Sequence, residues 1–217
     1  MTLLLALQLF SPVDPADVAR LHEQRIAREP DSKAAKRDYG LFLLRNGQAP
    51  LAEMYLRQSD VEPVYLAEAV AAQGRDAEAT KIFETCATTA RCLTRLANLA
   101  EKREDMPAAL ALYKRALEKD PSIARRSDHA LALQAALEYK EAERELRAAL
   151  AECEKVHGPN HPETATLLNN IAMLMGETKR PALARPLLQR AIKIFEQTLG
   201  PRHARTRIAR ENLEDLR

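Results

Sequence analysis

Apolar side chains recur every three or four residues along almost the whole chain, and polar residues fill the positions between them. This spacing places the apolar side chains on one face of an α-helix, whereas a strand would need strict alternation. Clusters of Pro, Gly, Asp and Asn separate the periodic segments and mark helix ends. The connections are a few residues long, so neighbouring helices should be antiparallel. We predict about 12 helices, at 15–29, 33–46, around 51–56, 63–74, 76–86, 91–103, 107–119, 123–136, 139–156, 162–175, 181–198 and 203–215.

Several helix ends carry specific capping residues. Asp14 followed by Pro15 is typical of a helix start, with the aspartate as N-cap and the proline at the first helical position. Asn46-Gly47 is typical of a helix end. Asp76 is expected to cap the helix that follows it.

A second pattern recurs in alternate helices: an alanine, a bulky residue four positions on, and a small residue three positions further. The i, i+4, i+7 spacing puts the three side chains on one stripe, where the small ends allow a neighbouring helix to approach closely. Each copy follows a shorter helix, which predicts a series of helix pairs. The copies are Ala52-Leu56-Ser59, Ala79-Phe83-Cys86, Ala109-Tyr113-Ala116, Ala142-Leu146-Ala149 and Ala184-Leu188-Ala191.

The C-terminal segment 157–217 repeats itself, and every matched pair of residues is separated by the same 42 positions. The matched pairs are Gly158-Pro159 and Gly200-Pro201, His161 and His203, Thr164 and Thr206, Asn170 and Asn212, and Leu174 and Leu216. A period of this length is typical of stacked supersecondary units, each of which buries its apolar face only against its neighbours.

These features resemble the tetratricopeptide repeat, whose motif combines a glycine in the first helix with Ala-x-x-x-Phe in the second and a proline after it. Tyr39-Gly40 and Gly47 match the first helix and its turn, and Ala109, Tyr113 and Pro121 match the second half. The segment HGPNHPETATLLNNIA is similar to LGPxHPxTAxxLNNLA of the long repeats in kinesin light chains. The intervals between successive stripes are 27, 30, 33 and 42 positions, and Lys179 and Pro181 depart from the long repeat, which usually has Gly and an aromatic residue there.

The resemblance implies an all-α fold in which antiparallel helix pairs stack into a right-handed superhelical solenoid. We expect one such solenoid over 13–217, with 203–217 as a C-terminal capping helix, because only Ile208, Ala209, Leu213 and Leu216 of that last helix are apolar. Residues 1–12 form a separate apolar segment. Its run Leu3–Phe10 is too short to span a membrane. It is either an extra helix or the core of an export signal; we favour the helix and a cytoplasmic location.

Charge and composition narrow the functional classes. The chain has 33 basic and 31 acidic residues, a net charge of +2, so no long-range field attracts nucleic acid or an anionic membrane. Ala, Leu, Arg and Glu dominate, and there is no Trp, which favours helices.

Cysteines and histidines give no sign of a cofactor or metal. Cys86 and Cys92 could form a disulfide if the protein is exported, but small apolar residues also suit their positions, as they suit that of Cys153. His157 and His161 have a metal-ligand spacing for a continuous helix. Gly158-Pro159 breaks that helix, so we expect no metal site, and we assign His161 and His203 to the starts of helices. Catalytic motifs such as HExxH, GxSxG or a phosphate-binding loop do not occur in the sequence.

In tetratricopeptide repeats the first helix of each pair lines the concave surface, and the resemblance therefore implies which residues face a partner. Asparagine is an unfavourable interior helix residue, so the consecutive Asn169 and Asn170 suggest a role in gripping a peptide backbone. The alternative is an ordinary solvated face, with the amides bonded between neighbouring repeats. The expected groove residues are Arg91, Arg95, Asn98, Asp128, Asn169, Asn170 and Asn212.

We therefore predict a non-catalytic scaffold that binds a peptide or helix of a partner protein in this groove. A structural subunit that associates through its end faces or its N-terminal apolar segment, including self-association, stays open as an alternative. An enzyme with an unrecognised site is a further alternative.

Overall fold

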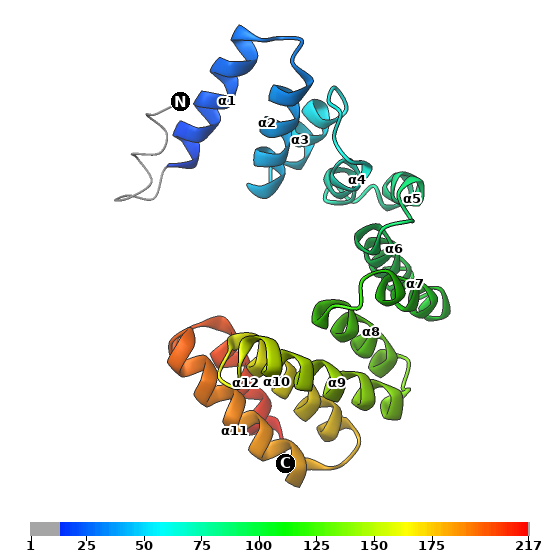
Figure 1. Ribbon diagram of the computed structural model, residues 1–217, viewed down its shortest axis with the longest axis vertical. Helices are drawn as coiled ribbons and strands as arrows, with labels where there is room; N and C mark the ends of the chain where they lie inside the picture. The colour runs from blue at the N-terminus through cyan, green and yellow to red at the C-terminus, as the bar shows by residue number, and fades with distance from the viewer. Residues whose placement is uncertain (1–13, 217) are drawn as a thin grey trace. The chain divides into compact units, whose positions relative to one another are not determined.

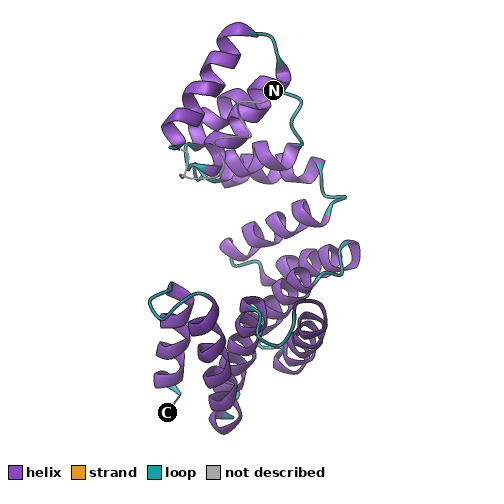
Figure 2. Cartoon of the chain, turned by 60° about the vertical axis from the view of Figure 1, so that its left-hand side comes forward, coloured by secondary structure: helices purple, strands orange, loops and turns teal. Residues whose placement is uncertain are grey.

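The computed structural model describes residues 14–216, and this part of the chain consists of twelve α-helices without a strand (Figures 1 and 2). The apolar segment 1–12 lies outside the described residues. The predicted all-α fold is confirmed. The helices are α1 (Pro15–Arg28), α2 (Lys33–Arg45), α3 (Ala49–Leu56), α4 (Pro63–Ala71), α5 (Asp76–Thr85), α6 (Ala90–Lys102), α7 (Met106–Lys119), α8 (Ile123–Ala135), α9 (Tyr139–His157), α10 (Pro162–Glu177), α11 (Pro181–Thr198) and α12 (Ala204–Asp215).

The helices pack in pairs, as the alternating pattern predicts. The pairs are α2–α3, α4–α5, α6–α7, α8–α9 and α10–α11, with α1 packed on α2 and α12 packed on α11. Second helices also pack on the first helix of the next pair, as α3 does on α4, α7 on α8 and α9 on α10. The chain divides into two compact units, Met1–Thr88 (unit 1) and Thr89–Arg217 (unit 2). The extent of a single solenoid over 13–217 stays a prediction.

Most predicted helix ends lie within a few residues of the observed ones. Asp14 accepts a hydrogen bond from the Ala16 amide at 2.9 Å and is the N-cap of α1. The predicted cap at Asp76 is wrong. Arg75 occupies the N-cap position of α5 without a side-chain cap, and Asp76 is the first helical residue. An acidic side chain in the first turn still stabilises the helix through its dipole.

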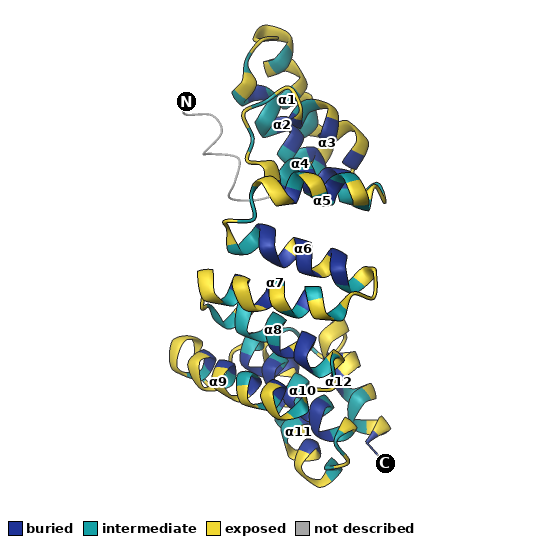
Figure 3. Cartoon of the chain, turned by 90° about the vertical axis from the view of Figure 1, so that its right-hand side faces the viewer, coloured by how far each residue is buried: buried dark blue, intermediate teal, exposed yellow. Residues whose placement is uncertain are grey.

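The alanine stripe of the second helices belongs to the buried core. Figure 3 shows buried positions on first and second helices alike. The alanines and bulky residues of the stripe are all buried, from Ala52 and Leu56 in α3 to Ala184 and Leu188 in α11. Ser59 and Cys86, at the ends of the first two stripes, are only partly buried. Helix α10 is buried most extensively, because both α9 and α11 pack on it.

Each helix pair turns through one residue in the left-handed region. These residues are Gly47, Gly74, Glu104, Leu137 and Lys179, with φ of 74°, 77°, 61°, 63° and 57°. The residue after each donates its amide to a carbonyl five residues earlier, as Arg180 does to Met175 at 2.8 Å. This is the Schellman ending, which favours glycine. Three turns therefore carry side chains in a conformation that strains them.

Gly40 shows why the first helix needs a small residue. A Cβ there would lie 2.6 Å from the Leu56 side chain and 3.3 Å from the Ala52 carbonyl. The glycine thus lets α2 approach α3 closely.

Among the described residues no helix is long and apolar enough to cross a membrane.

Candidate functional site

All seven predicted groove residues belong to unit 2, where they lie on the first helices α6, α8, α10 and α12. We call the side of these helices that carries them the first-helix face. Arg95 and Asn98 are exposed, and the remaining five side chains are partly buried. The face is polar, which distinguishes it from the apolar stripe of the second helices.

The structure brings Asn169 and Asn212 together. The Asn212 side-chain amide donates to the Asn169 side-chain oxygen at 2.9 Å, which joins α10 to α12. This is the amide bonding between neighbouring repeats that the sequence left open as an alternative. Asn170 differs, because its side chain makes no hydrogen bond within residues 14–216 and is partly exposed. Its amide can therefore bind another molecule without first breaking a hydrogen bond to the described residues.

The other groove residues have intramolecular partners. Asn98 accepts a hydrogen bond from the Tyr113 hydroxyl at 2.6 Å, and Glu101 is a second acceptor for that hydroxyl at 2.9 Å. Burial and the neighbouring Glu101 raise the pKa of Tyr113 above its usual range, so the hydroxyl stays a donor.

The charged members of the set are also engaged. Asp128 accepts from Arg125 at 3.0 Å. Arg91 and Arg95 both interact with other side chains or backbone groups of the protein. A carboxylate from a partner would therefore compete with existing contacts at these arginines.

The turns of the two C-terminal repeat copies have one shared geometry. His161 Nδ1 accepts the Glu163 amide at 3.2 Å, and His203 Nδ1 accepts the Arg205 amide at the same distance. Thr164 and Thr206 each donate to a glycine carbonyl, of Gly158 and Gly200, at 2.9 Å. The assignment of both histidines to helix starts is confirmed.

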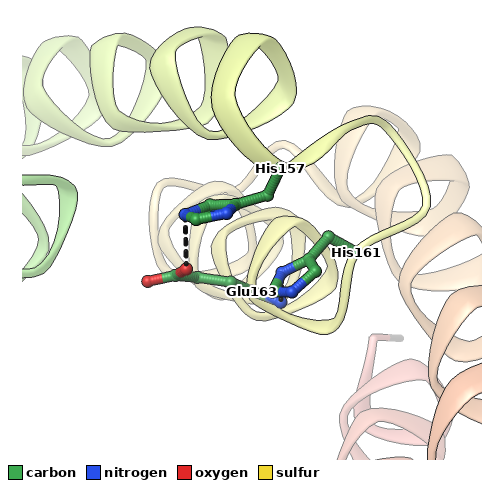
Figure 4. Close-up of side chains that lie close together, drawn as sticks. All are labelled: His157, His161 and Glu163. Carbon is green, nitrogen blue, oxygen red and sulfur yellow. Dashed lines mark hydrogen bonds and ion pairs between the residues drawn. The ribbon is translucent and has the colours of Figure 1, made fainter.

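Gly158-Pro159 ends helix α9 at His157, as predicted, but this break does not keep His157 and His161 apart. The loop returns the chain, so that the two rings stack with centroids 4.8 Å apart (Figure 4). His157 Nε2 also lies 3.3 Å from Glu163 Oε2. Two histidines and a carboxylate therefore share one surface cluster, which sequence spacing alone did not reveal.

Two family models match the chain, and both describe the tetratricopeptide repeat. One covers residues 89–119 and the other 123–197, which together include the pairs α6–α7, α8–α9 and α10–α11.

Residues 89–119 and 123–197 carry tetratricopeptide repeats.

Solved structures extend the likeness beyond these residues. Over 78% of this chain and 97% of the other, the fold resembles a kinesin light chain of Podosopora anserina with nearly identical repeats, at 18% identity and a TM-score of 0.65. Cut9, from a Cut9–Hcn1 complex, matches 94% of the chain at 16% identity and a TM-score of 0.69, but the chain spans only 39% of the Cut9 length. YrrB, described as having an unusual peptide-binding site, matches 89% of the chain at 17% identity and a TM-score of 0.57. No curated protein matches the sequence.

The C-terminal tetratricopeptide repeats also form a hollow that the sequence did not predict. It lies on the first-helix face, has a volume of about 80 Å³, and is lined by Thr166, Asn169, Phe195, Arg205 and Ile208. Of these only Asn169 was predicted. Thr166 and Ile208 occupy equivalent positions in the two copies of the C-terminal repeat, and this periodicity could have identified them.

Larger hollows flank the turn at Leu137, between α8 and α9. Their volumes are about 520 and 470 Å³, and both are lined by Leu137 and Glu138. Leu137 is 69% exposed. Unit 2 therefore also has hollows that lie apart from the one lined by Thr166 and Asn169.

Proposed function

We propose that this protein is a non-catalytic interaction module, which binds a peptide or helix of a partner protein on the first-helix face of unit 2. The observation that carries the proposal is the position of Asn170. Its amide is partly exposed, has no hydrogen-bond partner within the described chain, and adjoins a hydrogen-bonded pair that joins α10 to α12.

Physical chemistry supports this use of the asparagine. A side-chain amide donates and accepts hydrogen bonds, so it can pair with a peptide group whatever the side chain of the bound residue. The Asn169–Asn212 bond restrains the spacing between α10 and α12, which reduces the ordering that binding would require. The adjoining hollow at Thr166 and the half-exposed Ile208 offer apolar surface beside the polar contact.

The relatives agree with a binding role. Cut9 is part of a complex with Hcn1, and YrrB has a peptide-binding site. At 16% and 17% identity these likenesses show only that the fold is shared. The choice of the first-helix face as the binding surface therefore rests on the residues of this chain.

A pull-down followed by mass spectrometry should identify the partner. The double variant Asn170→Ala with Arg95→Glu should then lose the partner while its circular dichroism stays helical. Gln189→Ala is a suitable control, because it removes an exposed amide from the second helix α11. Equal loss of binding in the control would contradict the assignment to the first-helix face.

The alternative role is a structural subunit that associates through end faces or the N-terminal apolar segment. Deletion of residues 3–10 distinguishes it from groove binding. If this deletion abolishes association and the double variant does not, the structural role is correct and the groove proposal is wrong.

A further inference from the structure

The cluster of His157, His161 and Glu163 lies where α9 ends and α10 begins. His157 is the last residue of α9, His161 is the N-cap of α10, and Glu163 lies in its first turn (Figure 4). The side chains of His157 and Glu163 are 37% and 41% exposed, and His161 is exposed as well. The three side chains are therefore open to ions in solution.

The donor types and their spacing match a zinc ion. Two imidazoles with one carboxylate are a common zinc ligand set, and water completes the tetrahedron. Bonds of about 2.0–2.2 Å place neighbouring tetrahedral donors roughly 3.3–3.6 Å apart. His157 Nε2 and Glu163 Oε2 are 3.3 Å apart, and one donor atom from each of the three side chains lies within 4.8 Å of the others.

We propose that His157, His161 and Glu163 form a binding site for Zn²⁺ that links the end of α9 to the start of α10. The site is independent of the first-helix face. The negative end of the α9 dipole favours a cation beside His157, whereas the positive end of the α10 dipole opposes one beside His161 and Glu163. Arg190 donates to the Pro159 carbonyl in the same loop, but its charge is paired with Glu154 at 2.7 Å.

The second copy of the repeat shows that the turn does not need this cluster. Positions 157, 161 and 163 correspond to Leu199, His203 and Arg205, and the second turn keeps the same cap and the same threonine bond. His157 and Glu163 are thus additions to a turn that forms without them. The stability of the turn therefore does not explain why His157 and Glu163 are present.

Zinc binding requires a proton rearrangement at the histidines. Each neutral ring carries one proton, and a ring that ligates through Nε2 must carry it on Nδ1. His161 Nδ1 now accepts the Glu163 amide, so ligation through Nε2 displaces that hydrogen bond. At His157 the ion takes the place of the proton that would otherwise face Glu163.

Isothermal titration of the chelator-treated full chain with Zn²⁺ tests the proposal. We expect one site whose affinity falls about tenfold or more in each of His157→Ala and Glu163→Gln. His203→Ala is the matched control. It removes the same cap from the second repeat without touching the cluster, and it should bind Zn²⁺ as the wild type does.

Transplanting the cluster gives an independent test. Leu199→His together with Arg205→Glu recreates all three donors around His203, and the stoichiometry should rise from one to two. Circular dichroism verifies that each variant is folded. The proposal is overturned if wild type and the double variant His157→Ala, Glu163→Gln bind Zn²⁺ equally, or if His203→Ala weakens binding as much as His157→Ala.

Discussion

Glu53 in unit 1 and Glu143 in unit 2 occupy the same place in their repeats, and each holds two arginines. Both follow the first alanine of the stripe, and both accept from an arginine four residues on, Arg57 or Arg147. The second carboxylate oxygen of Glu53 accepts from Arg75 at 2.7 Å. The second oxygen of Glu143 accepts from Arg180, also at 2.7 Å. In each unit the carboxylate therefore links the second helix of one pair to the turn between the two helices of the next pair.

The two networks differ in burial and in size. The Glu53 side chain is 11% exposed, and its carboxylate also accepts from Gln73, while Glu78 binds both of the same arginines. The Glu143 side chain is 20% exposed, and within residues 14–216 its carboxylate binds Arg147 and Arg180 alone. Unit 1 builds this region from α3, α4 and α5, of 8, 9 and 10 residues, whereas α9, α10 and α11 have 19, 16 and 18. Short helices bury little apolar surface, so polar links carry more of the connection between repeats in unit 1.

Truncating the apolar residue beside each carboxylate should have the largest effect. Leu56 and Leu146 lie three residues after Glu53 and Glu143 and are buried to 1% and 0% exposure. Leu56→Ala and Leu146→Ala should each lower the free energy of unfolding by about 2–5 kcal/mol. Urea denaturation followed by circular dichroism measures this. A smaller loss than that of the carboxylate variants below would show that the polar network, and not the stripe, dominates.

Removing the charge of each carboxylate should destabilise unit 1 more than unit 2. Glu53→Gln should lower the free energy of unfolding by about 1–3 kcal/mol, because it leaves buried hydrogen bonds weakened. Glu143→Gln should cost about 0.5–1 kcal/mol, because its partners are more exposed to solvent. The same denaturation assay applies. Equal costs would mean that burial of the carboxylate does not matter.

Lowering the pH should reproduce these losses. Burial raises the pKa of Glu53, but hydrogen bonds from Gln73, Arg57 and Arg75 outweigh it and hold that pKa below its usual value. The Arg180 hydrogen bond likewise lowers the pKa of Glu143. The stabilisation is therefore complete above the unfolded pKa of about 4.3 and is lost as the pH falls through the folded pKa. Denaturation at pH 7 and at pH 3 should show the wild type converging on Glu53→Gln at the lower pH.

Substitutions of the turn residues before Arg75 and Arg180 should change the stability least. Gly74 precedes Arg75 and Lys179 precedes Arg180, both in the left-handed region. Lys179→Gly should raise the free energy of unfolding by about 0.5–1 kcal/mol by relieving strain. Gly74→Ala should lower it by about 1 kcal/mol. Thermal denaturation measures both, and a loss of stability in Lys179→Gly would show that the lysine side chain has a stabilising contact.

Much of the fold could be predicted because it depends on local periodicity. The alanine stripes, the cap at Asp14 and the histidine caps follow from side chains a few residues apart, where the helix itself sets the geometry. The seven groove residues stay a prediction. Two of them, Asn169 and Asn212, are hydrogen-bonded to each other. The repeat period relates Asn212 to Asn170 instead, so it does not predict this pair.

The sequence by itself determined the helices, their pairing and the buried stripe, since these depend on helical period and short connections. Only the tertiary structure decided which polar side chains meet. The partners of Asn169, Glu53 and Glu143 and the cluster at His157 come from separate helices or turns. Their contacts depend on the path of a loop and on the register between packed helices, and neither leaves a regular spacing in the sequence.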